Sequence, residues 1–190
     1  EPDFIEKMLK AAGEKPDCFS IQAKMVSMKE PDILDDAGNF YMLTGWAYAR
    51  GKGKTAEKYT KQDKIFSSCA GAAIYRNSAF EKIGYFDELH FAYLEDVDIG
   101  YRAGIFGYHN YYEPGAVVYH AGSATSGSRY NEFKIRLAAR NSVLLIYKNQ
   151  TILQWMIHFP ALFAGFIVKQ LFFSLKGFGL LYHNILNILN

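Results

Sequence analysis

Three closely spaced acidic side chains are the first candidates for chemistry in this sequence. Glu95, Asp96 and Asp98 lie within four consecutive positions, and Asp96-Val97-Asp98 has the form of a metal-binding DxD motif. If the segment is helical, residues two apart point about 200° apart, so the two aspartates cannot easily converge on one ion. Asp98 would then pair with Arg102, while Glu95 and Asp96 would lie near a helix N-terminus, where carboxylates are stabilised. A structural and a catalytic interpretation both remain open.

His120 and Gly71 are further candidates, each with a structural alternative. His120 ends the apolar segment Ala116–Tyr119 and precedes a loop rich in Gly, Ser and Thr. A lone histidine is more often a structural hydrogen-bonding group than a ligand, but loops that follow strands commonly carry functional side chains. Gly71, in Cys69-Ala-Gly-Ala-Ala73, provides either close packing of a strand on a helix or room for a ligand against the backbone.

The segment Gly51-Lys-Gly-Lys-Thr55 does not qualify as a phosphate-binding loop. That motif requires a glycine five positions before its Gly-Lys-Thr, and Tyr48 occupies the position here. Residues 51–64 are therefore predicted to form a basic, solvated loop.

Interleaved helices and strands must position these side chains. Capping residues and glycines mark the ends of the predicted helices, and runs of β-branched and aromatic residues mark the strands. We expect helices at 2–12, 77–84, 95–106 and 131–148, and strands at 19–28, 40–43, 65–75, 108–112 and 116–119. This order predicts an α/β fold.

Composition separates the body of the chain from its C-terminal segment. The 190 residues are 50% hydrophobic and 21% charged, with a net charge of +2, which excludes a disordered protein. Lys169 and Lys176 are the only full charges in 151–190, so residues 1–150 are formally neutral and lack the basic face of a nucleic-acid-binding domain. The two cysteines have neither zinc nor disulfide spacing, and we expect reduced thiols in a cytosolic protein.

The apolar segment 151–190 admits three interpretations. Its polar and small residues fall on one narrow helical face: Gln154, His158, Ala161, Gly165, Lys169 and Lys176. The segment could lie on a membrane surface, pack against the body or a second protomer, or span a bilayer. Pro160 predicts a break or kink. The membrane interpretation predicts that removal of residues 151–190 releases the protein from membranes.

An ordered series of short motifs runs through residues 1–149. In chain order they are Cys69-Ala-Gly-Ala-Ala-Ile-Tyr-Arg76, Gly84-Tyr-Phe-Asp-Glu88, Tyr93-Leu-Glu-Asp-Val-Asp-Ile-Gly-Tyr-Arg102, Gly107-Tyr108, Val118-Tyr-His120, Ser123-Ala-Thr-Ser-Gly127 and Arg140-Asn141. No single motif is decisive, but their order and spacing resemble glycosyltransferase family 2, in its rhamnosyltransferase-like branch.

The resemblance implies a fold and an activity. The fold is the A-type glycosyltransferase fold, a Rossmann-like α/β domain with a mostly parallel sheet, of which residues 1–149 would be the C-terminal part, followed by apolar helices in 150–190. Such enzymes move a sugar from a nucleotide-diphosphate donor to an acceptor hydroxyl with inversion. Many relatives use lipid-linked saccharide acceptors, so we expect an enzyme of surface-polysaccharide synthesis at the cytoplasmic face of the membrane, and a homodimer is a further expectation.

The resemblance also implies roles for individual residues. Asp96 matches the family's general base, which takes the proton of the acceptor hydroxyl, and Glu95 lies beside it. His120 matches a histidine that helps to hold a divalent metal, Mg²⁺ or Mn²⁺, which neutralises the leaving diphosphate. The donor-binding candidates, from the sugar wall and from a loop that can close over the diphosphate, are Gly71, Ala72, Ser123, Thr125 and Arg129.

The sequence departs from the family in its N-terminal half. In the family, the nucleotide-binding strands and a true DxD motif precede a segment like Glu1-Pro-Asp-Phe-Ile5, where this sequence begins. We therefore expect the C-terminal portion of a longer enzyme, inactive by itself. The alternatives are a non-catalytic, membrane-associated assembly subunit with the same fold and a metal-dependent hydrolase that uses Glu95, Asp96 and His120.

Overall fold

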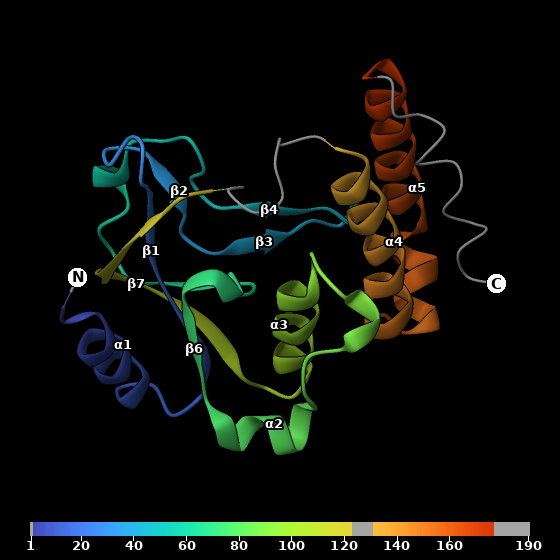
Figure 1. The fold of residues 1–190 in the computed structure, drawn as a ribbon. Coiled ribbons are helices and arrows are strands. Elements are labelled where there is room, and N and C mark those ends of the chain that lie inside the picture. Colours follow the sequence, from blue (N-terminus) through green and yellow to red (C-terminus); the bar gives the residue numbers. More distant parts are fainter. Residues whose placement is uncertain (1, 123–130, 177–190) are drawn as a thin grey trace.

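A computed structural model describes residues 2–122 and 131–176 as a mixed α/β fold (Figure 1). The helices are α1 (Phe4–Gly13), α2 (Asn77–Ile83), α3 (Glu95–Ile105), α4 (Glu132–Asn149) and α5 (Ile152–Leu175), with short 3₁₀ helices η1 (Ala56–Lys58), η2 (Ala70–Ala72) and η3 (Glu88–His90). The strands are β1 (Cys18–Ser27), β2 (Leu34–Asp36), β3 (Asn39–Tyr41), β4 (Ala47–Ala49), β5 (Asp63–Ile65), β6 (Ala73–Tyr75) and β7 (His109–His120).

The main sheet has two long central strands with short strands at its edges. Its order is β2-β1-β7-β5, and β6 also pairs with β1. Only β1 and β7 run parallel, so the described sheet is mixed and differs from the mostly parallel sheet that was expected. The connection between β1 and β2, residues 28–33, is shorter than the crossover of about a dozen residues that a parallel partner needs.

Helices pack on both sides of this sheet (Figure 1). On one side, Met8 and Ala11 of α1 are buried against Ile21 and other residues of β1 and β7. On the other side, a second core contains Phe19 of β1 and the buried residues of α2 and α3: Ala79, Ile83, Ile99 and Ala103. Gly100 allows α3 to pack closely against the segment that follows β5, because a Cβ at position 100 would lie 2.3 Å from the Cβ of Ser67. These contacts fix α3 against the sheet.

The segment predicted as one strand over 65–75 is divided in the structure. β5 ends at Ile65, η2 follows, and β6 begins at Ala73. The small residues between them bury little side-chain area, and the Cys69 N–H donates to Gln22 Oε1 at 2.6 Å instead of joining a strand ladder. The strands predicted at 108–112 and 116–119, in contrast, form the single strand β7, in which residues 114–116 bulge out of register with β1.

The C-terminal helices meet the body at the hairpin of β3 and β4, whose turn reaches α4 and α5 (Figure 1). A capping box formed by Thr151 and Gln154 starts α5. The helix then continues through Pro160 to Leu175, so the predicted break is wrong, while a kink at Pro160 stays a prediction. Pro160 removes one backbone donor from a helix of 24 residues, and the hydrogen bonds before and after it keep the helix continuous.

Candidate active site

The first turn of α3 presents the two carboxylates predicted to act as the base. Glu95 and Asp96 are the first residues of the helix, where its partial positive charge favours carboxylates. Asp96 Oδ2 accepts a long hydrogen bond of 3.4 Å from the backbone N–H of Ala70 in η2. Glu95 Oε2 is buried and finds no hydrogen-bond partner among the described residues. The N-terminus of α3 and η2 therefore form the two sides of the candidate site.

The surroundings of Asp96 destabilise its charged form. Burial and then the neighbouring charge of Glu95 raise the pKa of Asp96 to about 7, with a smaller contribution from Asp36. The backbone N–H groups of Ala70 and Val97 act in the opposite direction without cancelling this effect. A general base works best when its pKa lies near the operating pH, so the site has a carboxylate suited to take a proton at neutral pH.

Asp98 points away from this site and has a structural role. It is fully buried, and its Oδ2 accepts from Arg102 Nε at 3.0 Å while its Oδ1 accepts from Asn149 Nδ2 at 2.7 Å. The pairing of Asp98 with Arg102 one turn later is confirmed. Asp96 and Asp98 diverge, as helix geometry predicts, and do not form a DxD metal site.

The loop that leads into α3 has an unusual backbone. Phe91, Tyr93 and Leu94 have φ values of 58°, 68° and 68°, in the left-handed region that non-glycine residues seldom occupy. Each such residue costs on the order of 1–3 kcal/mol and persists only where its surroundings hold it. The sequence carries no signal for this conformation, because glycine or asparagine usually marks positive φ.

Asn141 of α4 holds this loop in place. Its side chain is fully buried, and its Nδ2 lies 2.8, 2.9 and 2.7 Å from the carbonyl oxygens of His90, Ala92 and Tyr93. The neighbouring Arg140 Nη1 donates to the carbonyl of Leu89 at 2.7 Å. α4 thus sets the path of the chain into α3. The Arg140-Asn141 pair was noted in the sequence only as part of the motif series, and its positioning role emerges from the structure.

Gly71 and Ala72 lie in η2, next to the Ala70 amide that contacts Asp96. Gly71 is exposed, and a Cβ there would meet Met25 Cε at 3.6 Å, which is ordinary contact. Close packing therefore does not require glycine at this position. A role for Gly71 and Ala72 in binding the donor stays a prediction.

A buried polar network beneath η2 was not predicted from the sequence. Gln22 Nε2 donates to Asp36 Oδ1 at 2.8 Å, and Gln22 Oε1 accepts from the Cys69 N–H. Burial raises the pKa of Asp36, although its hydrogen bonds from Gln22 and the Gly38 N–H oppose this. The one available signal was a glutamine in the middle of the apolar segment that forms β1. The network ties η2 to the sheet and so supports one side of the site.

His120 lies at the end of β7 and is engaged by Asp35. Its Nδ1 is 2.6 Å from Asp35 Oδ2, and Lys52 Nζ is 2.5 Å from Asp35 Oδ1. Burial alone would raise the pKa of Asp35, but the bonds to Lys52 and His120 hold it below its usual value. Within the described residues no hydrogen bond or ion pair joins His120 to Glu95 or Asp96.

The predicted divalent-metal site, with His120 as a ligand, requires several donor side chains close together. Among residues 2–122 and 131–176, no group of three His, Cys, Asp or Glu side chains is placed to hold a metal ion. With Nδ1 held by Asp35, His120 could offer only Nε2, which is a single ligand. The described residues alone therefore do not fit a metal site. Ser123, Thr125 and Arg129 lie outside the described residues.

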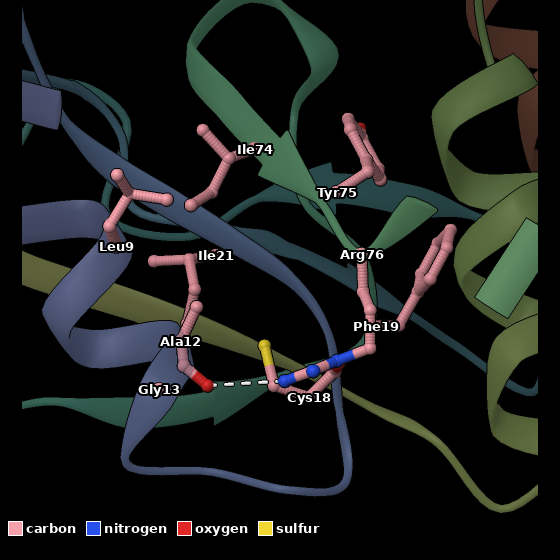
Figure 2. A pocket seen from close by; sticks show the side chains of 9 residues that line it. All are labelled: Leu9, Ala12, Gly13, Cys18, Phe19, Ile21, Ile74, Tyr75 and Arg76. Atoms are coloured by element: carbon pink, nitrogen blue, oxygen red, sulfur yellow. Dashed lines mark hydrogen bonds between the residues drawn. The ribbon is translucent and has the colours of Figure 1, made fainter. Parts of the chain in front are cut away.

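A hollow of about 220 Å³ lies away from this site, between α1 and the strands β1 and β6 (Figure 2). Most of its lining is apolar. Arg76, on its edge, donates to the backbone carbonyls of Cys18, Ala12 and Lys15. Because these carbonyls occupy its guanidinium and no carboxylate lines the hollow, Arg76 joins α1 to β1 and is not part of the candidate site.

Comparison with known proteins finds curated relatives of this chain. No family model matches the chain. Over 138 residues the chain is 33% identical to N-acetylglucosaminyl-diphospho-decaprenol L-rhamnosyltransferase from Mycobacterium tuberculosis strain CDC 1551 / Oshkosh, and equally to the protein of that name from strain ATCC 25618 / H37Rv. This chain is similar to rhamnosyltransferases. The match covers 66% of the chain and 45% of each relative, so the chain spans less than half the length of the curated relatives it matches.

Proposed function

We propose that this chain is the acceptor-side part of a glycosyltransferase that moves a sugar from a nucleotide-diphosphate donor to a lipid-linked saccharide acceptor in surface-polysaccharide synthesis. The observation that carries the proposal is Asp96, placed at the N-terminus of α3 beside η2 with its pKa raised to about 7. The similarity to rhamnosyltransferases supports it, because the name of these relatives describes transfer of rhamnose to a diphospho-decaprenol-linked sugar.

In the proposed reaction Asp96 is the general base. An acceptor hydroxyl donates its proton to the Asp96 carboxylate while its oxygen forms a bond to the anomeric carbon of the donor sugar. The bond from that carbon to the diphosphate breaks, and the nucleoside diphosphate leaves with the electron pair. Attack opposite to the leaving group inverts the anomeric configuration. The negative charge of Glu95 strengthens the affinity of Asp96 for the proton.

We propose roles in the same enzyme for the other predicted residues and segments. Residues 1–149 would form the C-terminal part of the catalytic domain, and Gly71, Ala72, Ser123, Thr125 and Arg129 would bind the donor. A dependence on Mg²⁺ or Mn²⁺, with His120 as one ligand, would require further ligands outside the described residues, so no step above depends on a metal. The enzyme would act at the cytoplasmic face of the membrane, with residues 150–190 as its membrane-facing part, and a homodimer stays a prediction.

The replacement Asp96→Asn tests this function. It keeps the size and one acceptor oxygen of the side chain but removes the base. In the full-length enzyme, transfer from a panel of nucleotide-diphosphate sugars to N-acetylglucosaminyl-diphospho-polyprenol should therefore fall by roughly 10²- to 10⁴-fold. Asp32→Asn, the same change at an exposed carboxylate, is the matched control and should leave transfer unchanged. Both variants should keep the circular dichroism and Tm of the wild-type protein. Near-normal transfer by Asp96→Asn would refute the assignment of the base.

A further inference from the structure

The polar and small residues of α5 face the body of the protein. Its less exposed residues recur every three or four positions: Gln154, His158, Ala161, Leu162, Gly165, Lys169, Gln170 and Phe173. Trp46 Nε1 donates to the carbonyl of Gly165 at 3.2 Å, and Lys169 Nζ lies 3.5 Å from Ser142 Oγ of α4. A Cβ on Gly165 would lie 2.4 Å from the carbonyl oxygen of Thr44. The narrow polar face seen in the sequence therefore packs on α4 and the β3–β4 turn around Gly165 and Lys169, whereas Lys176 is exposed.

The rest of α5 is an apolar surface, which we call the outer face. Its large exposed side chains are Ile152, Leu153, Trp155, Met156, Ile157, Phe159, Phe163, Phe166, Ile167, Val168, Leu171, Phe172 and Leu175. A helix on the surface of a water-soluble protein directs its apolar residues inward and its polar residues to the solvent. α5 has the reverse arrangement. An exposed apolar surface of this size marks a contact with a membrane or with another protein.

By length and composition alone α5 could cross a membrane. Its 24 residues rise about 36 Å, compared with a hydrocarbon core about 30 Å thick. However, α4 packs along the side of α5, as the following contacts show. Phe173 packs against Ile135 and Ala139 of α4, and Leu162 lines a small cavity together with Ile146. α4 therefore lies beside α5 from the middle of α5 towards its C-terminal end.

A crossing α5 would carry these neighbours into the hydrocarbon. α4 has charged side chains at Lys134, Arg136 and Arg140, and charged groups in the middle of a bilayer are costly. The β3–β4 turn, which touches α5 at Gly165, would bring irregular backbone into the lipid. With its axis parallel to the membrane surface, α5 can immerse the outer face while α4 and the turn stay in water.

We propose that α5 lies in the plane of the membrane surface, with its outer face among the lipid chains. Residues 151–176 contain no acidic side chain and end in Lys176, so their charge complements an anionic lipid surface. Tyr147 and Trp155, at the junction of α4 and α5, are residue types enriched at membrane interfaces. The inference rests on the proposed function only for its choice of lipid over protein, because the relatives are named for a substrate that is linked to decaprenol.

Sidedness of the two ends of α5 tests the orientation. Thr151→Cys and Lys176→Cys replace exposed residues that lie at opposite ends of the helix and do not belong to the outer face. They would be introduced singly into the intact protein, in sealed membrane vesicles of either orientation, and treated with a membrane-impermeant maleimide. The parent protein, with Cys18 buried and Cys69 partly buried, is the blank. Both new cysteines should react from the same side of the membrane. Reaction from opposite sides would show a spanning helix and overturn the proposal.

Vesicle binding tests the outer face itself. Ile157→Glu places a charge on the outer face and should weaken binding to phosphatidylcholine–phosphatidylglycerol vesicles at least 10-fold. Ile5→Glu, the same change at a similarly exposed residue of α1, is the matched control and should bind as the wild type does. Unchanged binding by Ile157→Glu would overturn the proposal, and so would a soluble dimer that this change dissociates and that does not bind vesicles. Neither measurement uses sugar transfer, so a failure of the proposed function would be distinguished from a failure here.

Discussion

At the scale of single residues, Asp96 combines properties that an acceptor-activating group needs. Burial and then the neighbouring charge of Glu95 raise its pKa from 3.8 to about 7, although its place at a helix N-terminus favours the charged form. Because the base must be unprotonated to accept a proton, transfer should decline as the pH falls below about 7 and level off above it. The sequence pointed to this residue through its place in the motif series, but its environment becomes visible only in the structure.

Glu95→Gln should change the pH dependence of transfer in a defined direction. The replacement removes the negative charge that is the second largest cause of the raised pKa of Asp96. The pKa of Asp96 should therefore fall, and the acidic limb of the plot of kcat/KM against pH should move to lower pH. Kinetics between pH 5 and 9 would measure the shift. An acidic limb that stays in place would mean that Glu95 does not act on the titration of the base.

At the scale of elements, α4 controls the entry into α3. Asn141 Nδ2 shares its two N–H groups among three carbonyl groups of a loop whose residues Phe91, Tyr93 and Leu94 have positive φ. Buried carbonyls that lose their donors cost about 1–3 kcal/mol, which is comparable to the strain that the loop stores. The direction of the first turn of α3 therefore depends on a side chain from a helix about 45 residues further along the chain.

Asn141→Ala should release this loop. We expect faster cleavage by chymotrypsin after Phe91 and Tyr93, and a fall in kcat of about 10-fold, a loss worth about 1.4 kcal/mol, with little change in KM for the donor. Asn77→Ala, at an exposed asparagine that starts α2, is the control and should change neither property. If Asn141→Ala were cleaved faster but kept its kcat, the contact would be structural and would not position the base.

The helices were predictable because their signals are local. Apolar spacing and terminal glycines or capping residues placed α1, α2, α3 and α4 within two residues at each end. The sheet was less predictable, since the pairing of three-residue strands such as β5 and β6 depends on contacts distant in sequence. The same limit applies to the candidate site. Glu95 and Asp96 are adjacent in the chain and could be found, whereas Gln22, Asp36 and Asn141 reach it only through the fold.

At the scale of the whole molecule, the body and the C-terminal segment have different surfaces. The body is formally neutral and has ion pairs at its surface, for example Arg50 with Asp63 and Lys7 with Asp3. The outer face of α5, in contrast, offers large apolar side chains to its surroundings. Averaged over the chain, these two parts give the hydrophobic and charged fractions of a typical globular protein.

Two truncations should separate the contributions of the C-terminal segment. Removal of residues 151–190 takes away α5 and should move the protein from the membrane pellet to the supernatant. Removal of residues 177–190 alone keeps α5 and should leave most of the protein in the pellet. Sedimentation of cell extracts, followed by immunodetection, would measure both. Unchanged sedimentation after the longer truncation would show that other parts of the protein bind the membrane.

α4 lies between the outer face and the candidate base. One side of it packs on α5 through Ile135, Ala139 and Ser142, while Asn141 holds the loop before Asp96. With α5 at the lipid surface, packed side chains rather than a flexible linker set the height of Asp96 above the membrane. An acceptor anchored by its lipid would have to present its hydroxyl at that height. The enzyme would then select acceptors by the distance between lipid and hydroxyl, and a headgroup one sugar longer would overshoot the base.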